Sequence, residues 1–300
     1  MTKVGFIGLG TMGLPMTKHL IDAGYTTFVV GRSRGPVEKA VAYGATEAAS
    51  PKELMEKVDI VMTCLPVPQS IMDVYEGENG LIAGASDGKI VIDHSTVDRT
   101  TNEHVARLLQ EKGALFLDAP VSGGPMGATA GTLTIMCGGL EQTFEKALPF
   151  MKAFGEYIVH VGPTGSGTVV KLLNNMLIGV HQSALAECYI MAEKAGVDPA
   201  IAYDLIKRSA GFSKSMDWSV DAILDRKFDP RFSINLLHKD IKLALQLAEE
   251  VNMPLELIKL GEQKVAEAKE KYGDQDVCAI VRPLEEKTGT ILKRRIKKGN

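Results

Sequence analysis

Short apolar runs alternate with helical patterns along the first half of the chain. The run at residues 3–8 leads into glycines, residues 12–23 carry apolar side chains at helical spacing, and a second apolar run follows at 26–30. Further runs of strand length lie at 59–66, 89–96, 114–124, 131–139 and 160–163. Strands that alternate with helices favour a doubly wound, mostly parallel sheet with helices on both faces.

The pattern becomes entirely helical after Gly167. Residues 168–195 contain no proline and keep apolar side chains at helical spacing, which predicts one long helix. The later segments DPAIAYDLIKRS, SINLLHKDIKLALQLAEEV and PLELIKLGEQKVAEAKEKYG also have helical patterns, and no convincing strand lies among them. We therefore predict an α/β domain over residues 1–163 and an all-helical domain over 164–300, entered through the long helix.

Composition and charge argue against several classes of protein. Of the 300 residues, 45% are hydrophobic and 24% are charged, as in a globular protein with a full core. The net charge of −3 shows no bias toward nucleic acid or an anionic membrane, and no run approaches the ~20 apolar residues of a membrane span. The basic end KRRIKKGN is interpreted as a short solvated terminus rather than a binding patch.

Cysteine and histidine usage predicts a reducing compartment and no metal. The four cysteines are scattered without a CxxC pair, which indicates buried or reduced thiols. The chain enters its first apolar run without the charged and apolar regions of a signal peptide, so we expect a cytoplasmic location. The six histidines lack the spacing of a metal site, and we expect no bound metal.

The segment between the first two predicted strands has the pattern of a phosphate-binding loop. Gly8, Gly10 and Gly13 make GxGxxG between a strand and a helix. The first glycine allows a tight turn, the second lets the backbone approach a pyrophosphate, and the third lets helix and strand pack closely, with the helix N-terminus facing the phosphate. The pattern favours a Rossmann-type dinucleotide site over a structural turn. Its expected residues are Gly8, Leu9, Gly10, Thr11, Met12 and Gly13.

The residues after the second predicted strand indicate which dinucleotide binds. A site selective for NAD usually places Asp or Glu here, to bind the ribose 2′-hydroxyl. This chain instead has Gly31, Arg32, Ser33 and Arg34, whose guanidinium and hydroxyl donors suit a 2′-phosphate. We therefore expect NADP rather than NAD; the alternative is a polar loop with two surface arginines.

Five motifs in order relate the chain to a known family. They are GFIGLGTMGLPM at 5–16, DHST at 93–96, DAPVSGG at 118–124, GSGTVVKLLNN at 165–175 and HKD at 238–240. With these motifs the chain resembles the β-hydroxyacid dehydrogenase family, which includes 3-hydroxyisobutyrate dehydrogenase, tartronate semialdehyde reductase and glyoxylate/succinic semialdehyde reductase. The resemblance implies reversible hydride transfer between NAD(P) and a short β-hydroxyacid, with the semialdehyde as oxidised partner, in a homodimer or homotetramer.

Lys171 is the candidate for proton transfer. It lies in VVKLLNNMLIGV, a helical segment that is apolar on nearly every side. Burial would lower the pKa of this amine toward neutrality, which suits a general acid or base; the alternative is a lysine that extends its amine to solvent. Asn175 is one turn onward on the same helix face. The resemblance implies that Lys171 is catalytic and that Asn175 binds substrate or positions the lysine.

The loop Ser122-Gly123-Gly124 is the candidate site for the substrate carboxylate. Successive backbone N–H groups beside a hydroxyl form an anion pocket, and the family uses this segment in that way; the alternative is a plain strand-to-loop turn.

The remaining candidates follow mainly from the resemblance. Leu65 and Pro66 are expected to line the cofactor groove, and Thr96 is expected near the nicotinamide unless it caps the next helix. The resemblance also implies that Lys239 contacts the cofactor and Asp240 the substrate, although in isolation both would be exposed helix charges.

These expectations combine into an NADP-dependent oxidoreductase that acts on a short β-hydroxyacid and its semialdehyde. One alternative is a substrate with a sulfonate in place of the carboxylate, such as sulfolactaldehyde, which the SGG pattern disfavours. Another is a non-catalytic NADP-binding module of the same fold, which the presence of Lys171 together with the glycine loop disfavours.

Overall fold

The computed structural model describes residues 2–295 and divides into two compact units, Met1–Lys171 and Leu172–Asn300. The division falls inside the long helix α9 (Ser166–Lys194), whose first turns make their contacts in the first unit. The domain boundary expected after residue 163 stays a prediction.

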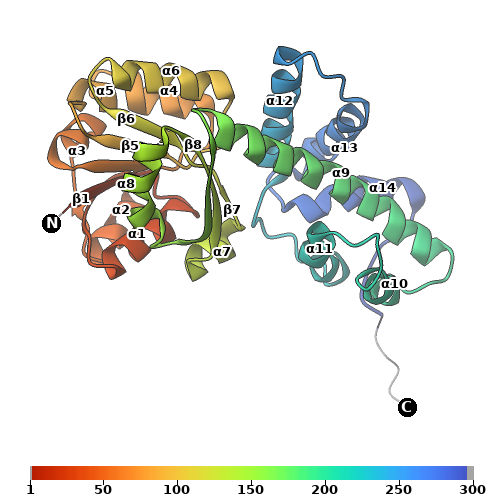
Figure 1. Ribbon diagram of the computed structural model, residues 1–300. Helices are drawn as coiled ribbons and strands as arrows, with labels where there is room; N and C mark the ends of the chain where they lie inside the picture. The colour runs from red at the N-terminus through yellow and green to blue at the C-terminus, as the bar shows by residue number, and fades with distance from the viewer. Residues whose placement is uncertain (1, 296–300) are drawn as a thin grey trace. The chain divides into compact units, whose positions relative to one another are not determined.

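The first unit contains one twisted sheet (Figure 1). Its strands follow the order β3-β2-β1-β4-β5-β6-β8-β7, and β9 pairs with β8. The pairs from β3 to β6 are parallel, whereas β8 runs antiparallel to both β6 and β7. The strands are β1 (Lys3–Ile7), β2 (Thr26–Val30), β3 (Thr46–Glu47), β4 (Ile60–Thr63), β5 (Ile90–Asp93), β6 (Leu115–Asp118), β7 (Val121–Ser122), β8 (Leu133–Gly139) and β9 (Gly155–Gly162).

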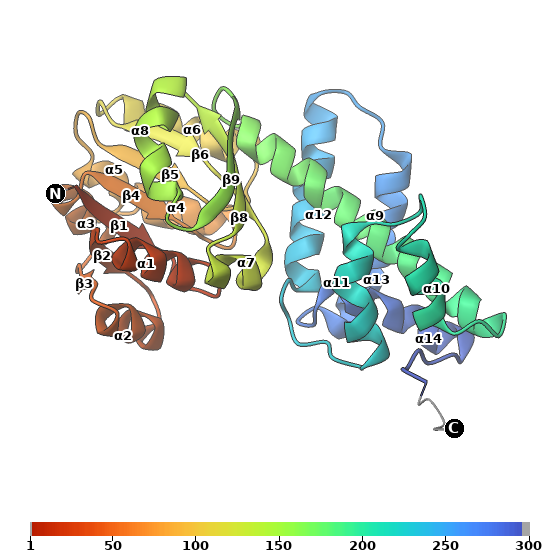
Figure 2. The same ribbon diagram turned by 60° about the horizontal axis from the view of Figure 1, so that its bottom comes forward.

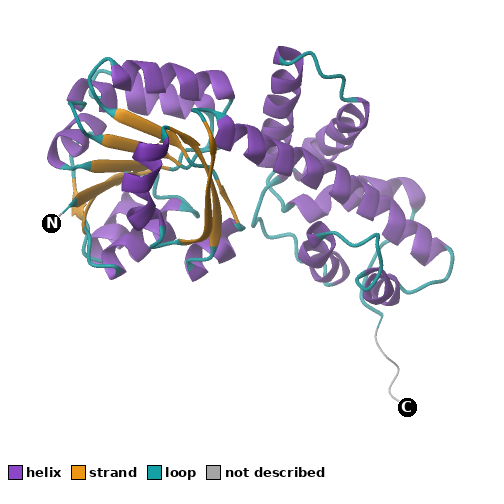
Figure 3. Cartoon of the chain, viewed as in Figure 1, coloured by secondary structure: helices purple, strands orange, loops and turns teal. Residues whose placement is uncertain are grey.

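Helices cover both faces of this sheet, as the alternating pattern predicts (Figure 3). They are α1 (Gly13–Asp22), α2 (Arg34–Ala42), α3 (Pro51–Lys57), α4 (Pro68–Glu76), α5 (Leu81–Gly84), α6 (Arg99–Gln110), α7 (Gly124–Ala130) and α8 (Glu141–Met151). Successive residues of β1 pack into different hydrophobic clusters. Phe6 belongs to the cluster with α1, α2 and α8, and Ile7 to the cluster with α3, α4 and α6. The order reverses at β1, which has β2 on one side and β4 on the other, and ligands of such sheets bind beyond the strand ends at this point.

The second unit is helical (Figure 2). Across the described residues it adds only an isolated bridge between Ser233 and Asp276 to its helices. Besides α9 these are α10 (Pro199–Ile206), α11 (Lys214–Leu224), α12 (Ile234–Glu250), α13 (Glu256–Tyr272), the 3-10 turn η1 (Val277–Ile280) and α14 (Val281–Thr288). The two-part fold class expected from the sequence is confirmed.

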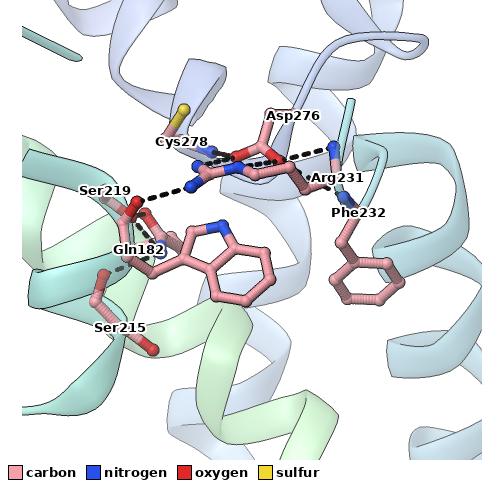
Figure 4. Close-up of polar contacts among 8 residues, drawn as sticks. Gln182, Ser215, Ser219, Arg231, Phe232, Asp276 and Cys278 are labelled. Atoms are coloured by element: carbon pink, nitrogen blue, oxygen red, sulfur yellow. Dashed lines mark hydrogen bonds and ion pairs between the residues drawn. The ribbon is translucent and has the colours of Figure 1, made fainter. Parts of the chain in front are cut away.

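The interior of the second unit also holds paired polar groups (Figure 4). The Arg231 Nη2 atom lies 3.0 Å from Oδ1 of the fully buried Asp276, and Gln182 Nε2 donates to Ser219 Oγ at 2.6 Å. Because an unpaired buried charge is costly, these pairings allow polar side chains to remain inside an apolar helix cluster.

Residues 2–295 contain neither a candidate membrane span nor a candidate metal site. No helix in that range is long and apolar enough to cross a membrane. Within the same range no three His, Cys, Asp or Glu side chains are grouped so as to hold a metal ion, and the lack of a metal requirement stays a prediction.

Candidate active site

The glycine loop has the geometry that its pattern predicts. Gly8 has φ +97°, and a Cβ on it would lie 2.2 Å from the Cys64 carbonyl oxygen. A Cβ on Gly13 would lie 1.9 Å from the Gly8 carbonyl oxygen, so only glycine lets the helix start this close to the strand. A Cβ on Gly10 would meet nothing within 4 Å. The loop is therefore tight at its first and third glycines and open at its second.

The helix that follows the loop starts without a side-chain cap. The residue before α1 is Met12, which makes no capping hydrogen bond, and the first turn contains no acidic side chain. The first N–H groups of a helix have no partner within the helix and carry its positive dipole end. Together with the open backbone at Gly10, this helix start suits the pyrophosphate of a dinucleotide.

The arginine loop is more complex than the sequence indicates. Arg34 begins α2, and its Nη1 lies 2.8 and 2.7 Å from the two carboxylate oxygens of Glu47. Its Nε lies 3.1 Å from Glu38 Oε1. Hydrogen bonds to Glu47 and then Glu38 raise the pKa of Arg34 above its usual value. Arg32 and Ser33 are exposed, and the Ser33 hydroxyl makes no capping hydrogen bond.

Glu47 is the acidic residue that sequence reasoning missed. No carboxylate follows β2 in the chain, but β3 pairs with β2 in register and places Glu47 opposite Val29. No strong signal in the sequence indicates this contact, because β3 is only two residues long.

A buried carboxylate ties together the loops after β4 and β5. Asp93 Oδ1 accepts hydrogen bonds from Thr63 Oγ1 at 2.6 Å, from Ser95 Oγ at 2.6 Å and from the Ser95 N–H at 3.1 Å. The Ser95 hydroxyl oxygen in turn accepts from the Leu65 N–H at 2.8 Å. Asp93 thus fixes the loop that begins at Leu65, a role the sequence did not indicate.

The predicted groove residues lie where these loops leave the sheet. A Cβ on Gly8 would lie 3.2 Å from Leu65 Cδ2, which places Leu65 beside the glycine turn. Pro66 is exposed and Thr96 is half-buried. The alternative role of Thr96 as a helix cap is wrong, because Asp98 accepts the hydrogen bond from the first turn of α6.

His94 is buried in its neutral form at ordinary pH. Its Nδ1 lies 2.7 Å from the Ala119 carbonyl oxygen, and because a carbonyl only accepts, Nδ1 carries the proton. Burial lowers the pKa of His94 to about 4, although the hydrogen bond to Ala119 favours the charged form. His94 therefore offers no acid–base chemistry near neutral pH.

The loop at Ser122, Gly123 and Gly124 turns sharply from strand to helix. β7 ends at Ser122 and α7 begins at Gly124. Gly123 has φ +134° and Gly124 has φ +62°, conformations that other residues rarely adopt. No side chain caps α7. The loop presents a hydroxyl and backbone N–H groups in sequence, as an anion pocket requires.

Lys171 lies in the second turn of α9 and is half-buried. The start of this helix is held by the buried Asp118 at the end of β6. Asp118 Oδ1 accepts from the Gly165 N–H at 2.6 Å and Oδ2 from the Thr168 N–H at 2.9 Å. Burial raises the pKa of Asp118 to about 6, although both backbone donors favour its ionised form. Asp118 is the first residue of the DAPVSGG motif, and the sequence alone did not indicate this role.

The second unit brings together three further predicted residues. Asn175 Nδ2 donates to Asp240 Oδ2 at 2.6 Å, and Lys239 Nζ lies 2.9 Å from Asp240 Oδ1. Asn175 is 1% and Asp240 2% exposed. The alternative interpretation of Asp240 as an exposed helix charge is therefore wrong, because the carboxylate is buried and paired.

Comparisons with known proteins cover nearly the whole chain. Residues 3–162 match the NAD binding domain of 6-phosphogluconate dehydrogenase, and residues 165–284 match a model described as NAD-binding of NADP-dependent 3-hydroxyisobutyrate dehydrogenase. The chain is 36% identical over 292 residues to 2-(hydroxymethyl)glutarate dehydrogenase of Eubacterium barkeri, covering 97% of each chain. It is 35% identical over 254 residues to 2-hydroxy-3-oxopropionate reductase of Escherichia coli, covering 84% of this chain and 86% of that protein.

A solved structure is similar over the same length. The 3-hydroxyisobutyrate dehydrogenase of Mycobacterium tuberculosis with L-serine matches with a TM-score of 0.88 and 31% identity, over 95% of this chain and 99% of that one.

Proposed function

The chain belongs to the β-hydroxyacid dehydrogenase family and is an NAD(P)-dependent oxidoreductase; from this premise we propose that it interconverts a short β-hydroxyacid and its semialdehyde with NADP. The observation that carries the proposal is the placement of Lys171 in the second turn of a helix whose start is bound to Asp118. Asp118 ends β6 at the carboxyl edge of the parallel sheet, the edge at which dinucleotides bind in this architecture. We therefore propose that the Lys171 amine acts in the same reaction as a nicotinamide bound at this edge.

The nucleotide is proposed to lie over the glycine loop. The loop residues Leu9, Thr11 and Met12, with the three glycines, hold the pyrophosphate, and Leu65, Pro66 and Thr96 line the groove. Arg32 and Ser33 bind the 2′-phosphate, supported by their exposure beside β2. Arg34 contributes only when it leaves Glu47, so the preference for NADP rests first on Arg32.

The proposed chemistry divides between cofactor and side chains. The nicotinamide supplies or accepts the hydride. Ser122, Gly123 and Gly124 hold the substrate carboxylate and fix its distance from the reacting carbon. Lys171 gives a proton to the carbonyl oxygen during reduction and takes it back during oxidation.

Asn175 and Asp240 complete the proposed substrate site. The Asn175 amide donates one N–H to Asp240 and accepts from Asn174 at 2.8 Å through its oxygen. Because an amide nitrogen carries two hydrogens, Asn175 has a second N–H, which we propose binds a substrate oxygen. Lys239 neutralises Asp240 and is proposed to contact the cofactor phosphates.

A substrate panel tests the proposal. NADPH oxidation is followed by absorbance with glyoxylate, succinic semialdehyde and 2-hydroxy-3-oxopropionate, and NADP reduction with 3-hydroxyisobutyrate, 2-(hydroxymethyl)glutarate and L-serine. We expect turnover with at least one carboxylate substrate. NADPH binding without turnover on any of them would contradict the proposal and favour the non-catalytic module, and turnover only with sulfolactaldehyde would favour the sulfonate alternative. No observation in the described residues favours either alternative.

A further inference from the structure

Asp118 binds a helix that is distant in the sequence. A helix start is usually capped by the residue just before it, such as Ser, Thr, Asp or Asn. Here the two hydrogen bonds come from a strand-end carboxylate 47 and 50 residues before the N–H groups that it accepts. Each carboxylate oxygen binds one N–H, so the position and tilt of the first turn of α9 follow from those of Asp118.

The chain leaves room for this carboxylate by using glycine around it. A Cβ on Gly138 would lie 2.5 Å from Asp118 Oδ1, and one on Gly167 would lie 2.1 Å from the Met136 carbonyl oxygen and 3.0 Å from Asp118 Oδ2. The 2.5 and 2.1 Å distances are incompatible with a side chain at either position. The close approach of β6, β8 and the first turn of α9 therefore depends on both glycines and on the carboxylate between them.

A second anchor acts on the same turn. Asn102 Nδ2, from α6, donates to Thr168 Oγ1 at 2.7 Å, and both residues are fully buried. Thr168 is thus held through its N–H by Asp118 and through its hydroxyl by Asn102. Lys171 follows three residues later. Its backbone position therefore depends on a turn that is held by Asp118 from β6 and by Asn102 from α6.

Asp93 provides an internal comparison. It is the register partner of Asp118 on the neighbouring strand and is also buried, but it accepts hydrogen bonds from Thr63, at the end of β4, and from Ser95, in the loop after β5. The two carboxylates end adjacent strands and hold different parts of the site.

We propose that Asp118 is the positioning residue for Lys171: its ionised carboxylate holds the first turn of α9 so that the amine meets the substrate carbonyl. This inference rests on the proposed function, in which Lys171 transfers the proton. A displacement of about 1 Å in such a group can lower turnover about 100-fold. Loss of the Asp118 carboxylate therefore reduces kcat and leaves cofactor binding nearly unchanged.

The pH dependence of kcat distinguishes positioning by an ionised Asp118 carboxylate from a purely structural role. Once protonated, Asp118 would direct an O–H at one of the two N–H donors and lose that hydrogen bond. The groups facing it are Asp93 on β5, the buried Cys137 thiol on β8 and the N–H groups of Gly165 and Thr168. Arg99 of α6 lies beside Gly165. Because the pKa of Asp118 is about 6, kcat falls as the pH drops through that value.

The experiment compares Asp118→Asn, Asp93→Asn and Lys171→Ala in the full-length protein. For Asp118→Asn we expect kcat to fall about 100-fold, the acid limb near pH 6 to disappear, and NADPH affinity by fluorescence titration to stay within about 3-fold. Asp93→Asn, matched in chemistry and burial, is expected to weaken NADPH binding more than it lowers kcat. Unchanged kcat and pH profile in Asp118→Asn would overturn the inference.

A second pair of variants keeps the test decisive if Asp118→Asn does not fold. Thr168→Val removes the hydroxyl that Asn102 holds, and Thr168→Ser retains it. We expect kcat to fall in the valine variant and to be rescued in the serine variant, because the turn that Asp118 holds loses its second anchor only in the former. A wild-type kcat without an acid limb near pH 6 would overturn the inference whether or not Asp118→Asn folds. Near-normal turnover in Lys171→Ala instead refutes the proposed proton donor, and this inference with it. If Lys171→Ala is inactive but Asp118→Asn has wild-type kinetics, this inference is refuted and the proposed function stands.

Discussion

Replacing Asn175 with alanine tests whether the buried pair that it forms with Asp240 stabilises the helical unit. The substitution removes the 2.6 Å hydrogen bond to the Asp240 carboxylate, both residues being nearly inaccessible to solvent. A hydrogen bond to a charged group contributes about 1.5–3 kcal/mol. The higher helix propensity of alanine returns about 0.5 kcal/mol. The expected net loss is therefore about 2 kcal/mol in the free energy of unfolding.

Urea denaturation measures this loss in the correct part of the molecule. The chain has a single tryptophan, Trp218, and it lies in α11 of the second unit, so its fluorescence reports the unfolding of that unit. With a slope of about 1–3 kcal/mol per molar urea, the midpoint should fall by roughly 1 M without a change in slope.

Asn174→Ala is the matched control. Asn174 is adjacent on the same helix, is half-buried and donates to the neutral Asn175 amide. A neutral hydrogen bond contributes about 1 kcal/mol, which the gain in propensity partly offsets, so the midpoint should stay close to that of wild type. Equal midpoints in Asn175→Ala and wild type would refute the reasoning that the Asn175–Asp240 contact stabilises the helical unit.

Three other predictions concern the cofactor, pH and assembly. Glu47→Gln should release Arg34 and so raise the ratio of kcat/KM with NADPH to kcat/KM with NADH several-fold, with Glu38→Gln as control. Arg32→Asp should lower this ratio. Unchanged ratios would mean that these side chains only contact solvent. The depressed pKa of His94 contributes stability that is present above pH 6.5 and lost as pH falls through about 4, so His94→Asn should flatten acid unfolding over that range. The raised pKa of Asp118 contributes stability that is lost as pH rises through about 6. Wild type and His94→Asn both contain Asp118, so this contribution cancels when their stabilities are compared. Exposed apolar side chains of the second unit, including Met191, Leu205 and Leu257, lead us to expect a dimer or tetramer by light scattering, and the mass of one chain would contradict this.

The sequence predicted the features that depend on local backbone geometry. The first and third glycines of GxGxxG have the tight turn and the close helix contact that the motif requires, because their conformations are set within a few residues. The alternation of strands and helices likewise follows from local periodicity.

The features that were missed depend on contacts between distant segments. Glu47 lies on a strand of two residues, too short to produce a period-2 pattern, and it reaches Arg34 only through sheet pairing. Asp118 meets its partners across about fifty positions of chain, and Asp240 is buried by Asn175 from another helix. Thr96 was the only cap considered for α6, whereas in the structure Asp98 accepts the hydrogen bond from the Thr101 N–H.

Steady-state reduction by Lys171→Ala, measured beside its NADPH dissociation constant, tests the central claim most directly. Loss of a positioned general acid should lower kcat about 10²–10⁴-fold, with NADPH affinity within a few-fold of wild type because the glycine loop is intact. Turnover close to that of wild type would show that the proton comes from another group and would contradict the account.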